Sequence, residues 1–404
     1  MDPASTSGHR LDAFAWLLTD PGQAVLARAM ELAAGDPLRA QSALRREFAA
    51  AEPSHVAMAM SQAELRRRAE PKFGADAARM YFTPDGLEQA TRVVVAEHRV
   101  ARLLAFEAAS AIDLGCGIGG DLLAMARAGI TAAGVDLDPE RVAVARANLA
   151  ALGLPGAVEV ADATGVDHSP FAVAFADPAR RGARGRVMDA EGWTPPWPFV
   201  LELLRRDACV KVAPGIPHEL IPGDVEAEFV SDGGEVKEAA LWAGRLATAR
   251  RRATVIPSTA PGQAAGGLAT LTEEDDPGAD VRPVGEFLYE PDGAVIRAGL
   301  VTAVAAGVGG GLIDQQIAYV TADQAFRTPF ARGYRVVEEL PYRERALRAA
   351  LCERGIGRLA IKKRGVAVVP EELRRRLSLQ GPNEATIVLT RARDEGICLL
   401  VQPF

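Results

Sequence analysis

A glycine-rich turn after a short apolar segment constrains the fold of this chain more than any other feature. Residues 111–121 read AIDLGCGIGGD: an apolar strand that carries an acid, a run of glycines, and the start of a helix. Glycine has no Cβ and adopts positive φ freely, so such a turn lets the backbone approach a nucleoside closely. The alternative is a purely structural turn between a strand and a helix.

The spacing of the glycines fits two kinds of ligand. Gly115, Gly117 and Gly120 satisfy the G-x-G-x-x-G pattern of dinucleotide-binding turns. Asp113 favours a different ligand, because a carboxylate there can bind the cationic amino group of a methionine moiety but would repel a pyrophosphate. With Gly119 these residues form Asp-x-Gly-x-Gly-x-Gly, which resembles the first motif of class I methyltransferases that depend on S-adenosylmethionine (SAM).

Two further acids continue the resemblance. Asp136 ends the next predicted strand, where an acid accepts hydrogen bonds from ribose hydroxyls. In the resembled family an acid at the position of Asp162 bonds the adenine amino group, and the backbone N–H at the position of Ala163 bonds the ring. The resemblance therefore implies SAM as the cofactor, held by the glycine turn and three acids.

Strands and helices are expected to alternate from residue 110 onwards. The predicted strands are residues 110–114, 131–135, 158–161, 171–176 and 208–212, and the helices between them include 119–127 and 139–152. Such alternation predicts a mostly parallel sheet with right-handed crossovers. The resemblance implies the Rossmann-like α/β sheet of class I methyltransferases, and residues 227–231 and 252–255 are expected to add a final hairpin.

Apolar residues at helical spacing predict a helical N-terminal region over residues 1–105. Its expected helices are residues 11–18, 24–34, 39–50, 61–68 and 86–106, with breaks at Pro21, Pro37, Pro53 and Pro71 and a capping box that starts at Ser61. The methyltransferase domain is expected over residues 106–257, a polar linker over 258–280, and a small α+β domain over 281–404.

A segment before the first strand resembles the part of trimethylguanosine-synthase-like enzymes that folds over the cofactor. It contains the sequences KFG from Lys72, MYFT from Met80 and LEQAT from Leu87. The resemblance implies contacts from Thr83 and Gln89 to the methionine carboxylate. The alternative is a connecting helix that Thr83 caps.

The tetrapeptide Asp177-Pro178-Ala179-Arg180 follows the fourth predicted strand. Ligands of open α/β sheets bind at the carboxyl ends of strands, so this segment should face the sulfonium of the cofactor. It resembles the [D/N/S]-P-P-[aromatic] motif of methyltransferases that act on exocyclic or amide nitrogens. In such a site Asp177 and a backbone carbonyl held by Pro178 would accept the hydrogens of a weakly nucleophilic amine and localise its lone pair.

Two positions depart from that motif, because Ala179 replaces the second proline and Arg180 replaces the aromatic residue. Trp193 and Trp197 are candidates to stack on a base in its place. Four arginines before them are candidates to hold phosphates: Arg180, Arg181, Arg184 and Arg186. The alternatives are tryptophans that pack within a loop and a solvated basic loop.

The cysteines do not predict covalent or metal chemistry. Asp-Pro-x-Arg also resembles RNA uracil-C5 methyltransferases, which need a cysteine nucleophile just after the fifth strand. Cys209 lies inside that strand and no cysteine closely follows it. The four cysteines lack C-x-x-C spacing, which predicts no metal site or disulfide framework and fits a cytoplasmic protein. No apolar run is long enough for a membrane span.

The C-terminal part is basic although the whole chain has a net charge of −7. Residues 327–376 hold 14 Lys or Arg and 6 Asp or Glu, and Lys362, Lys363 and Arg364 are consecutive within them. Residues 370–377 predict a helix, and 385–390 and 397–401 predict strands. This α+β unit resembles the THUMP-like domain that ends a family of bacterial SAM methyltransferases. THUMP-type domains occur in RNA-modifying enzymes, so the resemblance implies RNA as the partner; the alternative is a solvated charged face.

Together these features predict a SAM-dependent methyltransferase that transfers a methyl group directly to a nitrogen of an RNA base. The expected catalytic residues are Asp177, Pro178 and Arg180, and the expected RNA contacts are Trp193, Trp197, Arg181, Lys362, Lys363 and Arg364. Two other readings remain: a methyltransferase whose acceptor is a protein amide or a small molecule, and a non-catalytic RNA-binding protein. The RNA partner fits tRNA and rRNA equally, and the sequence predicts no oligomeric state.

Overall fold

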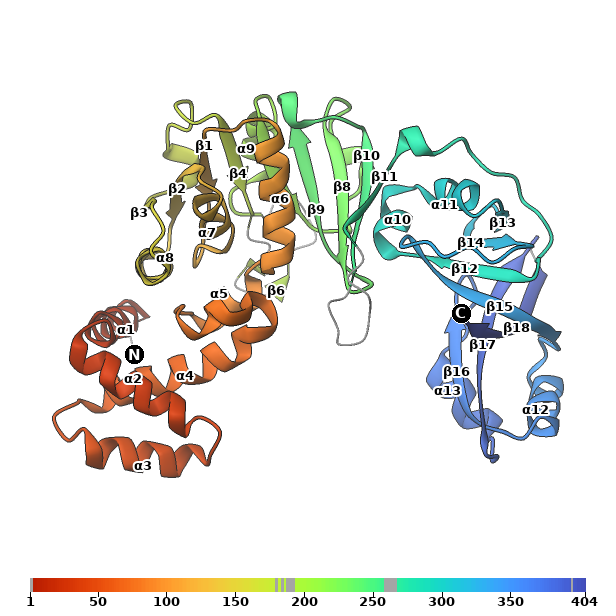
Figure 1. Ribbon diagram of the computed structural model, residues 1–404, viewed down its shortest axis with the longest axis horizontal. Coiled ribbons are helices and arrows are strands. Elements are labelled where there is room, and N and C mark those ends of the chain that lie inside the picture. Colours follow the sequence, from red (N-terminus) through yellow and green to blue (C-terminus); the bar gives the residue numbers. More distant parts are fainter. Residues whose placement is uncertain (1–2, 179–180, 183–184, 187–192, 258–266, 394) are drawn as a thin grey trace. The chain divides into compact units, whose positions relative to one another are not determined.

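The computed structural model describes residues 3–178, 181–182, 185–186, 193–257, 267–393 and 395–404 (Figure 1). The chain divides into two compact units. The first comprises Met1–Val212 and Leu241–Leu246, and the second comprises Ala213–Ala240 and Ala247–Phe404. Each unit buries its own apolar side chains.

Four helices open the first unit and confirm the predicted helical region. They are α1 (Pro3–Leu17), α2 (Asp20–Leu32), α3 (Pro37–Glu47) and α4 (Pro53–Phe73). Thr19 caps α2 by accepting a hydrogen bond from the backbone N–H of Gly22, and Asp36 caps α3 by accepting one from Arg39. These caps satisfy backbone donors that the first turn of a helix leaves free.

Helix α4 is longer than the sequence predicted, and it corrects two expectations. Ser61 lies in its middle, and the capping box joins Glu52 to His55 instead. Pro71 was expected to break the chain but lies in the last turn of α4. A proline there removes one backbone hydrogen bond and crowds the preceding turn, and the helix ends two residues later at Phe73.

The single helix expected over residues 86–106 is wrong, because the chain forms two helices. They are α5 (Pro84–Gln89) and α6 (Val93–Ala105), which follow the 3-10 helix η1 (Gly74–Ala78). The ammonium group of Lys72 donates to three carbonyl oxygens at the end of α5, those of Leu87, Glu88 and Ala90, at 2.7, 2.8 and 3.1 Å. A cation that caps these carbonyls stabilises the end of a helix at this point.

Five parallel strands form the core of the first unit, as the alternating pattern predicted. They are β1 (Ser110–Leu114), β2 (Thr131–Asp136), β3 (Ala157–Val160), β4 (Val173–Ala176) and β7 (Ala208–Val212), in the order β7-β4-β1-β2-β3. Helices α7 (Gly120–Arg127), α8 (Pro139–Leu152) and α9 (Trp197–Leu203) connect them. Leu114 pairs with both Val135 and Ala176, so the carboxyl ends of the strands meet at one edge, where open α/β sheets bind ligands.

Helix α6 packs against the strands and holds the short segment Leu241–Leu246 (Figure 1). The guanidinium of Arg102 lies 4.1 Å from the ring centroid of Trp242 and donates to the carbonyl oxygen of Leu246 at 3.1 Å. Trp242 is fully buried. A cation over an indole face combines burial with electrostatic attraction, so this contact fixes the segment to α6.

In the second unit, the predicted final hairpin is wrong. Strands β8 (Glu226–Asp232) and β10 (Arg251–Ile256) pair in parallel, and the chain between them contains a strand that the sequence did not predict, β9 (Glu235–Ala243). A parallel pair requires such a connection, whereas a hairpin requires a short turn. Strand β10 pairs antiparallel with β11 (Ala269–Thr272), which lies within the stretch expected to be a linker.

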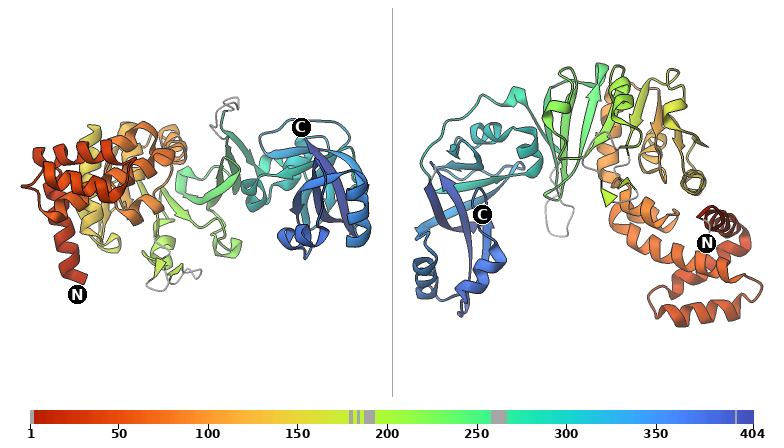
Figure 2. Two further views of the ribbon diagram at one scale, coloured as in Figure 1. Left: turned by 90° about the horizontal axis from the view of Figure 1, so that it is seen from below. Right: turned by 180° about the vertical axis from the view of Figure 1, so that it is seen from behind.

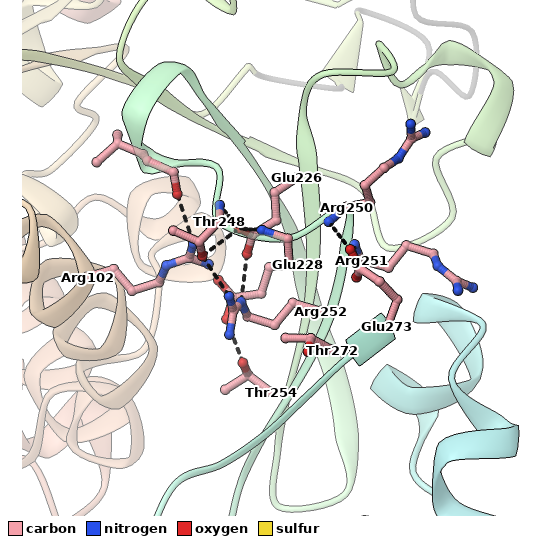
Figure 3. Close-up of polar contacts among 12 residues, drawn as sticks. Arg102, Glu226, Glu228, Thr248, Arg250, Arg251, Arg252, Thr254, Thr272 and Glu273 are labelled. Atoms are coloured by element: carbon pink, nitrogen blue, oxygen red, sulfur yellow. Dashed lines mark hydrogen bonds and ion pairs between the residues drawn. The ribbon is translucent and has the colours of Figure 1, made fainter. Parts of the chain in front are cut away.

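Two acids fasten the backbone that leads into β10 (Figure 3). The Oε2 atom of Glu226 accepts hydrogen bonds from the N–H groups of Thr248 and Ala249 at 2.8 and 3.1 Å, and its Oε1 atom accepts one from Arg252 Nε at 2.7 Å. Glu273 accepts from the backbone N–H groups at positions 250 and 251. Glu226 is fully buried, and these charge-assisted bonds compensate for its burial.

A seven-stranded sheet ends the chain and gives the α+β unit that the sequence predicted. Its strands are β12 (Phe287–Pro291), β13 (Gly311–Asp314), β14 (Ile317–Ala322), β15 (Ala331–Leu340), β16 (Ile356–Lys363), β17 (Asn383–Ala392) and β18 (Glu395–Pro403). Their order is β13-β14-β12-β15-β18-β17-β16, and β16 and β17 pair in parallel while the other neighbours are antiparallel.

Four helices belong to this part: α10 (Gly293–Ala298), α11 (Val301–Gly307), α12 (Glu344–Glu353) and α13 (Pro370–Leu377). Helices α12 and α13 cover one face of the sheet (Figure 2), where Leu347 and Leu373 pack with Ile387 and Leu389. Throughout the described ranges, no helix combines the length and the apolar character that a membrane span needs.

Candidate active site

Two glycines of the turn leave open space beside the backbone, and a third packs closely against a neighbouring helix. Gly115, Gly117 and Gly119 have φ values of +100°, +56° and +92°, which side chains rarely adopt. A Cβ built on Gly117 meets no atom of a described residue within 4 Å, and one on Gly115 lies 3.9 Å from the carbonyl oxygen of Asp177. One on Gly119 lies 3.5 Å from Ala145 of α8. The first two glycines therefore leave room for a ligand, and the third lets two helices approach.

Asp136 holds this turn in place. Its Oδ2 atom accepts a hydrogen bond from Gly117 N–H, and its Oδ1 atom accepts one from Asp138 N–H, both at 2.9 Å. Asp138 in turn caps α8, as its position before Pro139 favours. Asp136 is buried at the end of β2, so the acid predicted to bind ribose also fixes the conformation of the turn.

Asp113 is the most unusual acid of the site. Only 1% of its surface is exposed, and its Oδ1 atom lacks a hydrogen-bond partner within the described part of the chain. Burial and the nearby Asp177 carboxylate raise its pKa to about 8, against the opposing charges of Arg99 and Lys211. A buried acceptor without a partner is costly unless a ligand satisfies it. The cationic amino group of SAM would do so, and the open space at Gly117 provides room, so the site fits the cofactor.

Asp162 and Ala163 follow β3, at the same edge of the sheet where the carboxyl ends of the strands meet. Asp162 is exposed, and its Oδ1 atom accepts from the N–H and hydroxyl of Thr164 at 2.9 and 2.7 Å. These two bonds lower the pKa of Asp162. The three predicted acids thus lie at or near the carboxyl ends of β1, β2 and β3, and their binding roles remain predictions.

On the acceptor side of the edge, Asp177 forms an ion pair that the sequence did not reveal. Lys211 Nζ lies 2.5 Å from Asp177 Oδ2, since β4 and β7 are parallel neighbours and both residues lie near their carboxyl ends. Pro178, which follows, is buried. Lys211 is the single charged residue in the buried strand β7, and a lysine in such a strand indicates a specific partner.

The Asp177–Lys211 pair belongs to a longer set of contacts, which we call the polar circuit. Lys211 Nζ also donates to Thr91 Oγ1 at 3.2 Å, and the Thr91 hydroxyl donates to Asp121 Oδ2 at 3.0 Å. Asp121 pairs with Arg99, whose guanidinium lies 4.7 Å from the ring centroid of Phe175 on β4. The polar circuit is Asp177, Lys211, Thr91, Asp121 and Arg99, and all but Asp177 are buried.

The two tryptophans do not form an exposed platform. Trp193 and Trp197 are both buried, and their rings pack edge to face with centroids 5.4 Å apart and planes at 85°. This placement favours the packing alternative over stacking on a base. Arg180 and Arg184 lie outside the described residues, and only the backbones of Arg181 and Arg186 are described, in β5 (Arg181–Gly182) and in β6 (Gly185–Arg186), which pairs with it.

Two other expectations meet similar outcomes. Thr83 caps α5 by accepting from Gly86 N–H at 3.0 Å, and Gln89 is exposed at the end of that helix. The capping alternative for Thr83 is therefore confirmed. Cys116 is buried within the glycine turn, and burial raises the pKa of its thiol well above the ordinary value, which fits packing and not nucleophilic chemistry.

The three consecutive cations of the C-terminal sheet differ in their surroundings. Lys362 pairs with Glu290 at 2.6 Å, and Arg364 lies over the ring of Tyr319. Lys363 is exposed at the end of the edge strand β16. Their contact with RNA remains a prediction, and Lys363 is the best placed of the three. No group of three potential metal ligands is found among the described residues.

Three protein-family models match the chain. The model described as "Methyltransferase domain" matches residues 111–184, and the one described as "THUMP domain-like" matches residues 331–403. A third, "Domain of unknown function (DUF8688)", matches residues 10–69 of the helical region.

Known relatives agree with these matches. The chain is 40% identical over 341 residues to a protein named as an uncharacterized SAM-dependent methyltransferase, present in two strains of Mycobacterium tuberculosis. That alignment covers 81% of this chain and 90% of the relative. A crystal structure of a proposed methyltransferase from Porphyromonas gingivalis W83 has the same fold, with a TM-score of 0.70 and 20% identity over 99% of this chain and 98% of that one. This chain therefore belongs to the SAM-dependent methyltransferases, as a class I enzyme with a THUMP-like domain in its C-terminal part.

Proposed function

We propose that this enzyme transfers the methyl group of SAM to a nitrogen of an RNA base. The observation that carries the proposal is the Asp177–Pro178 turn at the end of β4. The backbone carbonyl oxygen of Asp177 faces the glycine turn at Gly115, and the Asp177 carboxylate is held by Lys211. Hydrogen-bond acceptors fixed beside the cofactor suit an acceptor that carries N–H groups.

The glycine turn and three acids would hold the cofactor. Asp113 offers to the amino group a buried oxygen that is unpaired within the described ranges, and Asp136 lies at the strand end where ribose hydroxyls bind. Asp162 and the backbone N–H of Ala163 would bind the adenine, as the family resemblance implies. When bound, SAM supplies an electrophilic methyl group on a positively charged sulfur.

Asp177 would orient the acceptor nitrogen. Lys211 occupies its Oδ2 atom, which leaves Oδ1 and the backbone carbonyl oxygen for two N–H hydrogens. These bonds localise the nitrogen lone pair toward the methyl group, and the proton leaves to water once the nitrogen carries the methyl. Catalysis on this proposal is mainly positioning and electrostatics.

Two features support RNA as the acceptor. The THUMP domain-like match covers residues 331–403, and the overlapping segment 327–376 holds 14 Lys or Arg against 6 Asp or Glu. Several of these cations are exposed and form no ion pair within the described part: Arg332, Arg335, Arg343, Arg345 and Lys363. Exposed cations supply the contacts to phosphates that RNA binding requires.

Mass spectrometry of nucleosides tests the proposal. RNA from cells that lack the protein should miss one methylated nucleoside, and the purified enzyme with SAM should restore it. A methyl group on a base nitrogen supports the proposal. A methyl group on ribose or on carbon would contradict the acceptor atom, and labelling of protein or of a small molecule would contradict RNA as the acceptor.

Asp177→Ala tests the role of the acceptor residue. Turnover should fall on the order of 1,000-fold, because the amine loses its fixed acceptor. SAM should bind at least as tightly as before, since Asp113 loses a like-charged neighbour that raises its pKa. Methyl incorporation and calorimetry measure the two effects. The matched control is Asp167→Ala, which removes an exposed acid that bonds Ser169. Full turnover in Asp177→Ala would remove this residue from the mechanism.

A further inference from the structure

We propose that Lys211 is a positioning residue for methyl transfer, and that the rest of the polar circuit holds it in place. The inference rests on the proposed role of Asp177. Lys211 Nζ lies 2.5 Å from Asp177 Oδ2 and 3.2 Å from Thr91 Oγ1. Two fixed partners restrict the ammonium group to one position, which in turn fixes the rotation of the Asp177 carboxylate.

The polar circuit closes on the strand where it begins. It runs from Asp177, at the end of β4, through Lys211, Thr91 and Asp121 to Arg99, and Arg99 lies over Phe175 of the same strand. Asp121 is the second residue of α7, the helix that directly follows the glycine turn. The circuit therefore ties the residue that would orient the acceptor to the helix that follows the cofactor turn. Buried polar groups keep such positions only when every partner is present.

Charge gives Lys211 a second effect on Asp177. Asp177 and the buried Asp113 repel each other, and Lys211 and Arg99 are the cations that offset this repulsion, with Asp136 as a further acid nearby. In Lys211→Met, Asp177 keeps its acidic neighbour and loses its paired cation. The carboxylate then has no fixed partner at Oδ2 and can turn away from the position in which Oδ1 accepts the amine hydrogen.

The experiment compares Lys211→Met, Lys211→Arg and the native enzyme, with RNA from cells lacking the protein as acceptor and labelled SAM. Lys211→Met should lower kcat on the order of 100-fold while the Kd for SAM changes less than about threefold. Lys211→Arg, which keeps the cation, should recover at least a tenth of the native kcat. Lys237→Met, on β9 and paired with Glu235, is the matched lysine control.

Each result decides the question. A parallel loss of kcat and of SAM affinity in Lys211→Met, or no recovery by Lys211→Arg, would reduce Lys211 to a structural residue, and native kcat in Lys211→Met would overturn the inference outright. If Lys211→Met fails to fold, Thr91→Val decides, because it removes a hydroxyl and no charge. It should lower kcat about tenfold with SAM binding intact, and unchanged kcat would contradict the circuit. If the native enzyme labels protein instead of RNA, the proposed function fails, and the same variants are compared on that acceptor.

Discussion

Two short stretches of this chain were predicted to bind ligands, the glycine turn through its backbone and the run of three consecutive cations through its side chains. In the structure, the residues of the two stretches differ in how well they are placed to do so. In the glycine turn the predicted ligand contacts come from the backbone: Gly115 and Gly117 have left-handed φ values and leave open space at one edge of the sheet. In the run Lys362, Lys363 and Arg364 the predicted RNA contacts come from side chains, and of the three only Lys363 is exposed while its neighbours make internal contacts. A run of glycines that sets the geometry of one turn brings neighbouring backbone groups to the same place. Consecutive side chains on a strand instead point to opposite faces of the sheet, so they do not form one surface.

The predicted backbone contacts of the glycine turn are tested most directly by comparing Gly117→Ala with Gly129→Ala. Both glycines have left-handed φ, +56° and +83°, and a Cβ on either meets nothing within 4 Å in the part of the chain that the structure describes. Each variant should lose about 1 kcal/mol of stability from strain alone. Only Gly117→Ala should also weaken SAM binding, by about 100-fold, because its methyl group fills the space beside Asp136 that the cofactor needs. Calorimetry and urea unfolding separate the effects, and equal SAM affinity in the two variants would break the comparison.

Asp113→Asn tests the buried acid next to the glycine turn, whose Oδ1 atom lacks a hydrogen-bond partner among the described residues. The folded pKa of Asp113 is about 8, raised from 3.8 by burial first, so the folded state binds the extra proton between these values. The native free energy of unfolding should therefore fall as pH rises across this window, by at most about 1.4 kcal/mol per pH unit from this group. Asparagine cannot ionise, so the variant should lose that slope and be more stable than the native protein at pH 8.

The same variant should bind SAM about tenfold more weakly, since a neutral amide replaces a carboxylate partner of the amino group. Urea unfolding at pH 6 and pH 8, with and without SAM, measures both effects. An identical pH dependence of stability in the two proteins would show that Asp113 is ionised throughout, contrary to its buried position.

The sequence predicted those parts of the fold that local patterns control. Alternating apolar strands and helices gave the five parallel strands from β1 to β7, and the helix at Pro370–Leu377 was predicted with its bounds. The break between α5 and α6 was missed because Lys72, a residue distant in sequence, caps α5. The parallel pairing of β8 with β10 was missed because β9, which separates them in the chain, was not recognised.

The site shows the same division. The acids at the strand ends could be placed because a parallel sheet brings its carboxyl ends together. The polar circuit could not, since Thr91, Arg99, Asp121 and Lys211 come from four separate segments and no spacing in the sequence relates them. Only the charge within the apolar strand β7 indicated that Lys211 has a partner.

The smallest expected effect distinguishes two neighbours in the cation run. Lys363→Ala removes an exposed charge, so RNA binding should weaken about threefold and the slope of log affinity against log salt should fall by about 1. Its stability should stay within about 0.5 kcal/mol of native. Lys362→Ala removes the partner of Glu290 and leaves that carboxylate with the Tyr334 hydroxyl, so stability should fall by about 1–3 kcal/mol. Filter binding over a salt series and urea unfolding measure the two. If Lys362→Ala changed the salt slope and Lys363→Ala did not, the internal pair with Glu290 would open on RNA, and consecutive cations would act as the sequence alone suggests.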